Sequence, residues 1–509
     1  MNRRFLALAA AAALLSASGC APALPADTLR MAQTVIPRSL DPADNYASWD
    51  LMRFGVGECL ARFDEKMTPL PWLAESWSAD PSRTVWTFRI RNGVFFSNGR
   101  PLTAEAVRAS LLRVFERSPR ARSFFTPKAI EADGQRLVIR TEAPAPNLPG
   151  LLADPLFLVI DTEASGDIRR RGPVGTGPYR LDEADSAVFH FSANPYRAVP
   201  FRRLDVVFVP DPGASSMALQ AGETDVLPNA APESLPLFRG GPYRVSETAS
   251  LRSVLARFNA APGRPLEDRR VRAALISACD RKTWCEILLG GAFIPGGPAL
   301  PPSMDCGFDA LRDPNGYDPE RAKRLLDEAG WTDTDGDGIR EKDGRKLELT
   351  LITYPDRPYL PALAEAVQAD AGKAGIRVRI EIVDYSVLVS RGKDGSWDLL
   401  ATSILTGSTG DPEVYLDRYW GSGGEEGNVT GWHSDAYDAL AAELASAIEP
   451  GQRRAIVVRM QQLLLDEAAA LVFGYPKAAM VSSARVEGAK ITPADYYWIT
   501  DAIRPAEKP

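Results

Sequence analysis

The chain has 509 residues, of which 45% are hydrophobic and 25% charged, a composition typical of a soluble globular protein with about two or three domains. Its formal net charge of −7 provides no basic footprint, so we do not expect nucleic-acid binding. Only two histidines are present, which excludes a histidine-rich metal site. The HExxH and GxSxG motifs are also missing, so little supports an enzymatic function.

The N-terminus predicts an exported protein. A positively charged start precedes an apolar run over 5–15, which has the length of a signal-peptide core and is too short to span a bilayer. Residues 17–20, Ala-Ser-Gly-Cys, resemble a lipobox, where a signal peptidase cuts before a lipid-modified cysteine. We therefore expect a signal peptide over 1–19, lipidation of Cys20 and a linker over 20–27. The alternative is an ordinary cleavage region, which would release a periplasmic protein without an anchor.

Four further cysteines remain, an even number for a compartment that permits disulfides: Cys59, Cys279, Cys285 and Cys306. Cys279 and Cys285 lie on nearly opposite faces of a helical pattern, which argues against a bond between them. We expect a disulfide between Cys285 and Cys306. The alternative is that all four are small buried thiols.

The first strongly patterned elements form a strand, a turn and a helix. Residues 85–91 alternate in the two-residue period of a half-buried strand. Asn92-Gly93 then predicts a tight hairpin that returns into a short strand over 94–96. Thr103 is a favourable N-cap, and apolar residues follow it at helical spacing, so a helix is expected to begin there.

The second half of the chain alternates between helices and strands. A long amphipathic helix is predicted over 271–289. The strand, helix and strand predicted over 347–353, 362–374 and 377–382 indicate a βαβ unit, and therefore a mostly parallel sheet. A final apolar strand is expected over 471–475.

A set of short phrases in fixed order carries a family resemblance. Residues 73–111 contain LAESW, VWTF, RNGVFFSNG and PLTAE, and later phrases include GTGPY at 175–179, YDPERA at 317–322 and AGW at 329–331. This order resembles the family 5 extracellular solute-binding proteins, the peptide, nickel and opine receptors of ABC importers. The resemblance extends over nearly the whole mature chain.

The resemblance implies an α/β periplasmic-binding-protein type II fold, with two lobes joined by a hinge and an inserted third domain. It also implies a monomer that binds its ligand between the lobes and delivers it to ABC permease subunits in the cytoplasmic membrane. The boundaries that we infer are 28–63, 178–258 and 484–509 for lobe I, 64–177 for the inserted domain, and 259–483 for lobe II.

Two arginines are candidate ligand contacts. Arg120 matches an arginine that, in the nickel-binding branch of the family, faces the carboxylates of the metal's small-molecule chelator. Its neighbour Arg122 is a second candidate, but the aromatic residue expected beside them is Ser123. The alternative is that both arginines are solvated surface charges.

The loop at 405–412 follows a predicted strand, and ligands of α/β folds are held at the carboxyl ends of such strands. Thr406, Ser408 and Asp411 are therefore candidate contacts. Peptide-binding relatives commonly place an aspartate at the position of Ser408 to hold the ligand's amino group, so its absence weakens a simple free-amine peptide interpretation. Asp411 could take that role, or it could serve only as a turn and helix-start residue.

Large aromatic residues are frequent in the last quarter of the chain. Most are expected in the core, but Trp420 and Trp432 could stack on a ligand enclosed by lobe closure. His433, which follows Trp432 before a predicted helix, is a candidate contact or a helix-entry residue.

An acidic loop matches the first half of a calcium-binding loop. Asp333, Asp335 and Asp337 occupy the first three ligand positions and Glu341 the ninth, whereas Gly344 stands where a bidentate glutamate is expected. Calcium is the single cofactor that we consider, and the alternative is a tight surface turn.

Together these observations predict an exported solute-binding protein that captures a peptide-like ligand or a nickel chelate for an ABC importer. A secreted hydrolase that uses carboxylates is one alternative, although no paired-acid motif is present. A ligand-sensing receptor without a transport role is another. Adjacent permease and ATPase genes would distinguish that receptor from a transport protein.

Overall fold

The computed structural model describes residues 25–44, 46–164, 166–424, 427 and 429–507. The predicted signal peptide and Cys20 lie outside these residues.

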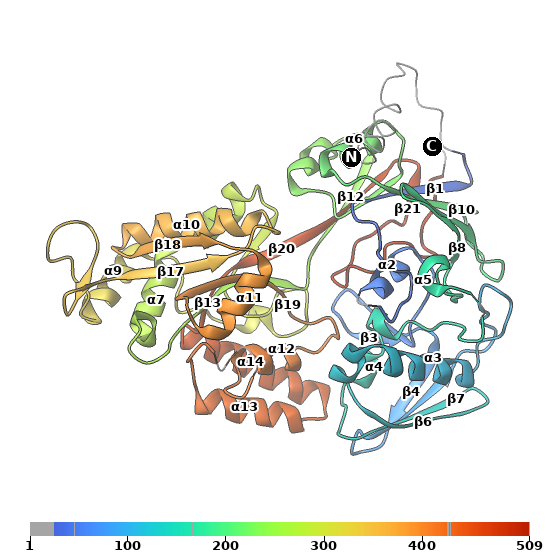
Figure 1. The fold of residues 1–509 in the computed structure, drawn as a ribbon, viewed down its shortest axis with the longest axis horizontal. Helices are drawn as coiled ribbons and strands as arrows, with labels where there is room; N and C mark the ends of the chain where they lie inside the picture. The colour runs from blue at the N-terminus through green and yellow to red at the C-terminus, as the bar shows by residue number, and fades with distance from the viewer. Residues whose placement is uncertain (1–24, 45, 165, 425–426, 428, 508–509) are drawn as a thin grey trace, which may run out of the picture.

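Twelve strands in the described part of the chain form one mixed sheet (Figure 1). Ten of them follow the order β18-β17-β19-β13-β20-β11-β1-β10-β9-β8, and β12 and β14 also pair with β20. Their bounds are β1 Thr28–Gln33, β8 Tyr179–Ala184, β9 Val188–Ala193, β10 Arg203–Phe208, β11 Val226–Pro228, β12 Tyr243–Ala249, β13 Arg252–Phe258, β14 Phe293–Pro295, β17 Glu348–Thr353, β18 Arg377–Ile382, β19 Leu399–Leu405 and β20 Ala470–Ser483.

The helices cover the sheet or form separate layers beside it. Their bounds are α2 Ala47–Arg53, α3 Ala104–Arg117, α4 Leu148–Leu151, α5 Ile168–Arg171, α6 Pro212–Gln220, α7 Arg269–Ala278, α8 Arg281–Thr283, α9 Pro319–Glu328, α10 Tyr359–Lys373, α11 Tyr385–Asp394, α12 Glu413–Trp420, α13 Asp435–Ser446 and α14 Pro450–Asp466. Within the described ranges, no helix is long and apolar enough to cross a membrane.

Strand β20 joins the two halves of the molecule. Its first half pairs with β13 and β14, and its second half pairs with β11 and β12. In Figure 1 it runs from the yellow and orange part on the left to the blue and green part on the right. We call the part with β1 and β8–β12 the first lobe, and the part with β13, β14 and β17–β19 the second lobe. The α/β two-lobe architecture predicted from the sequence is therefore confirmed.

The βαβ unit predicted in the second lobe is confirmed. Strands β17 and β18 are parallel, with Leu351 opposite Ile380, and α10 connects them and packs on both. Leu351 is fully buried in one hydrophobic cluster with Val367 of α10 and Val378 of β18. The apolar face of α10 and the apolar strands thus pack into one core.

A smaller sheet forms the inserted domain, with strand order β4-β5-β7-β6. The bounds are β4 Ala74–Ala79, β5 Val85–Ile90, β6 Pro127–Asp133 and β7 Arg136–Thr141, with the short pairs β2 Ala61–Phe63 and β3 Pro69–Pro71, β15 Glu341–Lys342 and β16 Arg345–Lys346, and β21 Val486–Glu487 and β22 Arg504–Pro505 elsewhere. The predicted alternation is confirmed, since Trp86, Phe88 and Ile90 are buried. The Thr103 cap of α3 is also confirmed, because its Oγ1 accepts a hydrogen bond from the Ala106 N–H at 3.2 Å.

The predicted hairpin at Asn92-Gly93 is wrong. Gly93 does turn the chain with a positive φ of 73°, but the following residues form only an isolated bridge between Phe95 and Pro101. Both edges of β5 are already paired, one with β4 and the other with β7. No hydrogen-bonding edge is therefore left for a returning strand.

The single long helix predicted over 271–289 is also wrong. Helix α7 ends at Ala278, and Asp280 then caps a new turn by accepting a hydrogen bond from the Thr283 N–H at 3.0 Å. A π-helical turn over Trp284–Leu288 follows. An aspartate side chain that competes for backbone N–H groups favours such an interruption over a continuous helix.

The predicted disulfide between Cys285 and Cys306 is not formed. Cys59, Cys279, Cys285 and Cys306 are all free and buried, as the alternative interpretation had it. Burial raises the pKa of the Cys285 and Cys306 thiols to about 12. These side chains therefore remain neutral and pack as small apolar residues.

Candidate ligand-binding cleft

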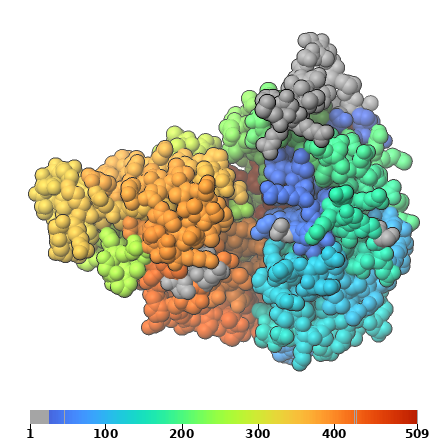
Figure 2. Space-filling model, in the orientation of Figure 1, coloured from blue at the N-terminus to red at the C-terminus, as the bar shows by residue number. Residues whose placement is uncertain are grey.

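The main cavity lies between the two lobes and has a volume of about 740 Å³, within the usual range for small-molecule sites. Figure 2 shows the molecule hollowed between the orange segment that contains α11 and the blue segment that contains α2. The first lobe lines the cavity with residues of β1 and α2, and the second lobe with residues of β13, β19, α11 and α12. Because both lobes line it, a bound molecule would contact both.

The wall from the first lobe centres on Arg53. Its guanidinium group lies 4.3 Å from the ring centroid of Trp498 and 5.7 Å from that of Trp49. It also forms ion pairs with Asp495 at 2.9 Å and Asp50 at 3.4 Å. Burial raises the pKa of Asp50, and Arg53 opposes that shift. This wall therefore offers flat aromatic rings to a ligand, and its charged side chains already pair with one another.

The opposite wall carries arginines and tyrosines. Arg252 lies at the start of β13, and Arg257, farther along the same strand, lies 5.2 Å from the ring centroid of Tyr419. Tyr354, which follows β17, packs edge-on against Tyr385 with ring centroids 5.1 Å apart. Burial lowers the pKa of Arg252, and the nearby positive charge of Arg357 lowers it further. Arginine nevertheless stays protonated at physiological pH, so this wall is cationic.

A second cavity of about 240 Å³ adjoins the first and shares Leu405, Arg418 and Tyr419 with it. It lies between the inserted domain and the loop that follows β19. Four residues proposed from the sequence line this space together: Arg120, Thr406, Ser408 and Asp411. The structure thus brings together two segments that are far apart in the sequence.

Arg120 lies at the floor of the second cavity, on the short turn Pro119–Ser123. Its guanidinium is 3.5 Å from the fully buried carboxylate of Asp154, and it lies 4.9 Å from the Tyr46 ring centroid and 5.2 Å from that of Phe124. Burial raises the pKa of Asp154, against the effect of Arg120. Arg122, on the same turn, is exposed and lines neither cavity.

The loop candidates already have partners inside the protein. The Thr406 hydroxyl donates to the Leu251 carbonyl at 3.0 Å. Asp411 forms an ion pair with Arg453 at 2.7 Å and accepts a hydrogen bond from the Glu413 N–H at 2.9 Å. Asp411 therefore organises the start of α12, and Thr406 fastens the end of β19 to the neighbouring chain.

The remaining candidates lie away from both cavities. Trp420 and Trp432 are buried in the main core, and the ring of Trp432 packs edge-on against Tyr437 at 5.5 Å. His433 is exposed at the entry to α13, where its ring nitrogen Nε2 lies 2.9 Å from Asp435. In this conformation none of the three contacts the cleft.

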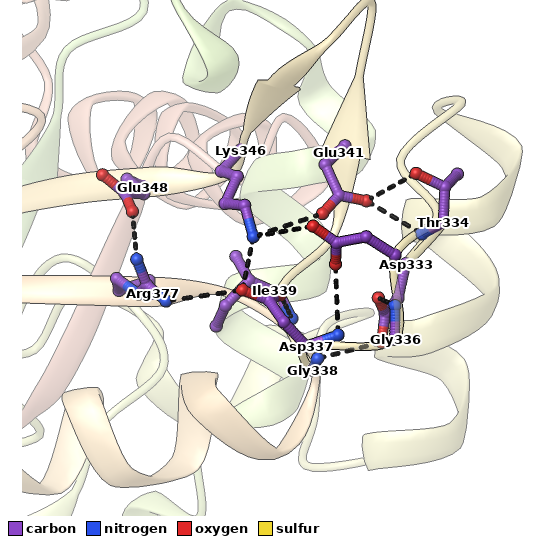
Figure 3. A network of polar contacts seen from close by, with 11 residues as sticks. Asp333, Thr334, Gly336, Asp337, Gly338, Ile339, Glu341, Lys346, Glu348 and Arg377 are labelled. Atoms are coloured by element: carbon purple, nitrogen blue, oxygen red, sulfur yellow. Dashed lines mark hydrogen bonds and ion pairs between the residues drawn. The ribbon is translucent and has the colours of Figure 1, made fainter.

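The acidic loop forms a network of polar contacts around a lysine (Figure 3). One carboxylate oxygen from each of Asp333, Asp335, Asp337 and Glu341 falls within 4.8 Å of the others. The Lys346 ammonium lies among them, 3.1 Å from Asp335 and 3.7 Å from Glu341, and it also pairs with Asp337. Hydrogen bonds to Asp337 and Asp335 raise the pKa of Lys346. A cation from the chain itself thus occupies the region where a metal would bind.

Most of the cleft residues carried no sequence motif. Trp49, Arg53 and Trp498 come from opposite ends of the chain and meet only in the folded first lobe. Tyr354 could have been proposed from the sequence as a cleft residue, because it directly follows the carboxyl end of a parallel strand. Arg252 begins an antiparallel strand, so that rule could not identify it.

Comparison with known proteins gives a consistent family assignment. Residues 68–427 match the model of the bacterial extracellular solute-binding proteins, family 5 Middle. The nickel-binding periplasmic protein of Escherichia coli (strain K12) is 27% identical over 449 residues, which cover 84% of this chain and 85% of that protein. Di/tripeptide-binding protein 2 of Pseudomonas aeruginosa is 28% identical over 512 residues, which cover 92% and 93% of the two chains.

Solved structures share the same architecture. The nickel ABC transporter from Bacillus halodurans superposes with a TM-score of 0.83 at 27% identity, covering 94% of this chain and 99% of that chain. NikA from Brucella suis in complex with Fe(III)-EDTA gives a TM-score of 0.83 at 25% identity, with the same coverage. The fold is therefore shared along nearly the full length.

Proposed function

Because this chain belongs to the bacterial extracellular solute-binding proteins of family 5, we propose that it captures a small ligand between its two lobes for an ABC importer. The cavity of about 740 Å³ carries this proposal, since residues of both lobes line it. A ligand that contacts both lobes binds the closed form more tightly than the open form and thereby shifts the population toward closure. The closed form is the state that would dock on the permease.

The chemistry of the cleft supports binding without catalysis. The described residues that line the main cavity include no cysteine or histidine, so they form neither a Cys–His nor a Ser–His pair. Its two carboxylates, Asp50 and Asp495, are both paired with Arg53. The alternative of a carboxylate-dependent hydrolase therefore gains no support.

The relatives suggest two ligand classes. The names of the compared relatives specify nickel for one and di- or tripeptides for the other. For this chain, Ser408 stands where peptide-binding relatives hold the ligand's amine, and Asp411 already pairs with Arg453. The second cavity, where Arg120 lies beside two aromatic rings, supports a ligand that differs from a simple free-amine peptide.

Export, lipidation of Cys20 and a monomeric state complete the proposal. The E. coli relative is named as periplasmic, and the leader of this chain has the features of an exported lipoprotein. The intact mass of the mature protein purified from membranes tests the anchor. A diacylglyceryl mass increment on a chain that begins at Cys20 is expected.

Native mass spectrometry of the mature protein, purified without denaturation and combined with metal analysis, tests the binding function. We expect a monomer that carries one equivalent of a small ligand, which is released on unfolding. A matched variant, Trp498→Ala, removes an aromatic wall of the cavity and should lower ligand retention, whereas Trp432→Ala alters the core away from it. A ligand retained equally by the wild-type protein and Trp498→Ala would contradict binding at this cleft.

A further inference from the structure

The loop between β19 and α12 is held from outside the second lobe. It follows a strand of the second lobe, yet its residue Thr409 contacts the inserted domain. The side-chain nitrogen Nδ2 of Asn147, at the start of α4, donates a hydrogen bond to the Thr409 carbonyl at 2.7 Å. Because a carbonyl oxygen only accepts hydrogen bonds, this contact depends on the NH2 group of the asparagine.

The Asn147 side chain does not cap its own helix. Asn147 occupies the N-cap position of α4, where the side-chain oxygen of an asparagine usually accepts a hydrogen bond from a backbone N–H of the first turn. Among the described residues, the structure shows no such bond for Asn147. The amide group instead reaches a residue that lies 262 positions farther along the sequence. Its side chain therefore serves the contact between the inserted domain and the loop.

Gly150 allows the loop to approach α4 closely. It lies inside α4 and has a helical backbone conformation rather than a positive φ, so its backbone alone does not require glycine. A Cβ atom at this position would lie 2.4 Å from the Thr409 carbonyl oxygen and 2.5 Å from Oδ1 of Asn147. Both distances are too short for non-bonded atoms. The close approach of the loop therefore requires a glycine here.

The next residue of the loop packs against the short pair formed by β2 and β3. Gly410 has a positive φ of 74°, and a Cβ atom there would lie 2.4 Å from the Met67 carbonyl oxygen and 2.8 Å from the Phe63 ring. Phe63 ends β2, and Met67 lies in the turn before β3. Residues 409 and 410 are thus seated between this turn and α4.

The seated loop supplies one wall of the second cavity, and the inserted domain supplies the other. Thr409 lines that cavity together with the loop residues proposed from the sequence, and Leu151 of α4 lines it from the opposite side. Asn147 and Gly150 line neither this cavity nor the main one. Their contact with Thr409 therefore acts on the cavity only by fixing how its two walls lie relative to each other.

The contact joins the second lobe to a domain that is attached to the first lobe. The Val159 N–H donates to the Glu58 carbonyl at 2.9 Å, and Ile160 lies in one hydrophobic cluster with Met31 of β1. In Figure 1, α4 and α12 face each other in the lower part of the molecule, and β20 crosses above them. The loop is thus held at a place distinct from the strand that joins the lobes.

We propose that Asn147 and Gly150 are positioning residues of the ligand site: they hold the loop after β19 against the inserted domain and thereby fix the wall of the second cavity that this loop supplies. This inference rests on the proposed solute-binding function and adds to it residues that do not line the cavities. A loop that is already held in place loses less conformational freedom when a ligand binds to it, so the contact favours ligand retention.

Hydrogen-exchange mass spectrometry of the mature protein, dialysed free of small molecules, tests the contact. Two amides report on the loop. The Thr406 N–H donates to the Leu251 carbonyl at 2.9 Å, and the Gly410 N–H donates to the Gly407 carbonyl at 3.0 Å. Asn147→Asp removes the amide donor and keeps a residue that is equally favourable at an N-cap. We expect both amides to exchange about 3- to 10-fold faster in this variant, as loss of one hydrogen bond predicts.

Gly150→Ala disturbs the same contact and leaves the amide of Asn147 in place. Its added methyl group should displace the Thr409 carbonyl and accelerate exchange in the loop in the same way. The matched control is Gly372→Ala in α10, where a Cβ atom would meet no described atom within 4 Å other than its immediate backbone. Unchanged exchange of the loop in both variants would overturn the proposal. So would an equal acceleration in β4–β7, which would show that the inserted domain itself is destabilised.

Native mass spectrometry of the same variants separates this inference from the proposed function. The probe is the small molecule that the wild-type mature protein retains, identified by its mass. We expect Asn147→Asp and Gly150→Ala to retain about 3-fold less of it. Equal retention despite faster exchange of the loop would overturn the positioning role and leave the solute-binding function intact. A wild-type protein that retains nothing would contradict the proposed function, and the exchange measurement would still decide whether the contact positions the loop.

Discussion

At the scale of single residues, the pair formed by Arg120 and Asp154 couples the inserted domain to the second cavity. Asp154 is fully buried, accepts a hydrogen bond from the Leu156 N–H at 3.0 Å and faces Arg120 at 3.5 Å. The oxygen Oδ2 of Asp154 and the nitrogen Nη1 of Arg120 are buried without a hydrogen-bond partner among the described residues. The pair is therefore incompletely satisfied, which leaves donors and acceptors near the space that a ligand would enter.

This pair has a consequence for the dependence of stability on pH. Burial raises the pKa of Asp154 above its ordinary value of 3.8, so that the folded state holds a proton which the unfolded state has already released. The contribution of Asp154 to the free energy of unfolding is therefore expected to fall as the pH rises from 3.8 through the raised pKa. In Asp154→Asn this fall should be missing from a series of thermal melts at increasing pH.

Other buried carboxyl groups also have raised pKa values, so the informative quantity is the difference in melting temperature between variant and wild type at each pH. Asp435→Asn is a suitable control, because the Asp435 side chain is 98% exposed. Parallel profiles for the wild-type protein and Asp154→Asn would contradict the raised pKa.

At the scale of single elements, hydrogen bonds and a lysine hold the acidic loop before β15 together. Asp333 accepts hydrogen bonds from the Gly336 N–H at 2.8 Å and the Gly338 N–H at 3.0 Å. Lys346, on β16, supplies the positive charge that its carboxylates need. We propose that this lysine replaces calcium in the loop, which then serves as a structural turn.

Removal of that lysine is expected to create a dependence on divalent cations. Calcium and chelators should leave the melting temperature of the wild-type protein unchanged. Among the described residues, Lys346→Met leaves the four carboxylates with one nearby cation, Arg377 at 3.8 Å from Asp337, so its melting temperature should fall and then rise when calcium is added.

The matched control is Lys323→Met, which removes a lysine paired with Glu320 on the surface of α9. Calcium should not affect it. Stabilisation of the wild-type protein by millimolar calcium would contradict the replacement and favour an occupied calcium loop.

At the scale of the whole molecule, two neighbouring segments connect the lobes. One is the link between β12 and β13, and the other is the middle of β20. They are joined by a hydrogen bond from the Ser250 N–H to the Pro476 carbonyl at 2.9 Å. Few backbone torsions therefore need to change when the lobes move, as expected for a hinge.

Closure on ligand predicts a change in overall size. The radius of gyration from small-angle X-ray scattering should decrease when a ligand binds between the lobes, because the ligand has contacts to both only in the closed form. Trp49 and Trp498 line the cavity, so their fluorescence should change over the same concentration range. Binding without any decrease in the radius would contradict closure.

Trp498→Ala at the same ligand concentration provides the control for that experiment. Its scattering should match that of the free protein, because less ligand is bound.

The local elements were predictable because their signals lie in neighbouring residues. The alternation of Trp86, Phe88 and Ile90 and the cap at Thr103 depend on a few consecutive positions. The prediction of a hairpin at Asn92-Gly93 was wrong because the residues of a turn do not reveal which strands pair with the edges of β5. The prediction of one helix over 271–289 was wrong because it gave more weight to the apolar spacing than to the capping tendency of Asp280.

The candidate site was predictable only in part. Arg120 and the loop after β19 do line one cavity, but Trp432 and His433 do not. Large aromatic residues near loops are equally suited to the core and to a ligand, and burial decides between these roles only after the chain has folded.

By itself, the sequence determined the family, the α/β class and the main strands and helices of each part of the chain, because motifs and hydrophobic periods are local properties. Only the tertiary structure decided the composition of the cleft. Arg53, Arg252, Tyr354 and Trp498 come from four distant segments, and the pairing of β13, β19 and β20 brings them to one cavity. The charge of that cavity is a property of the assembled sheet, and no single segment of the chain contains it.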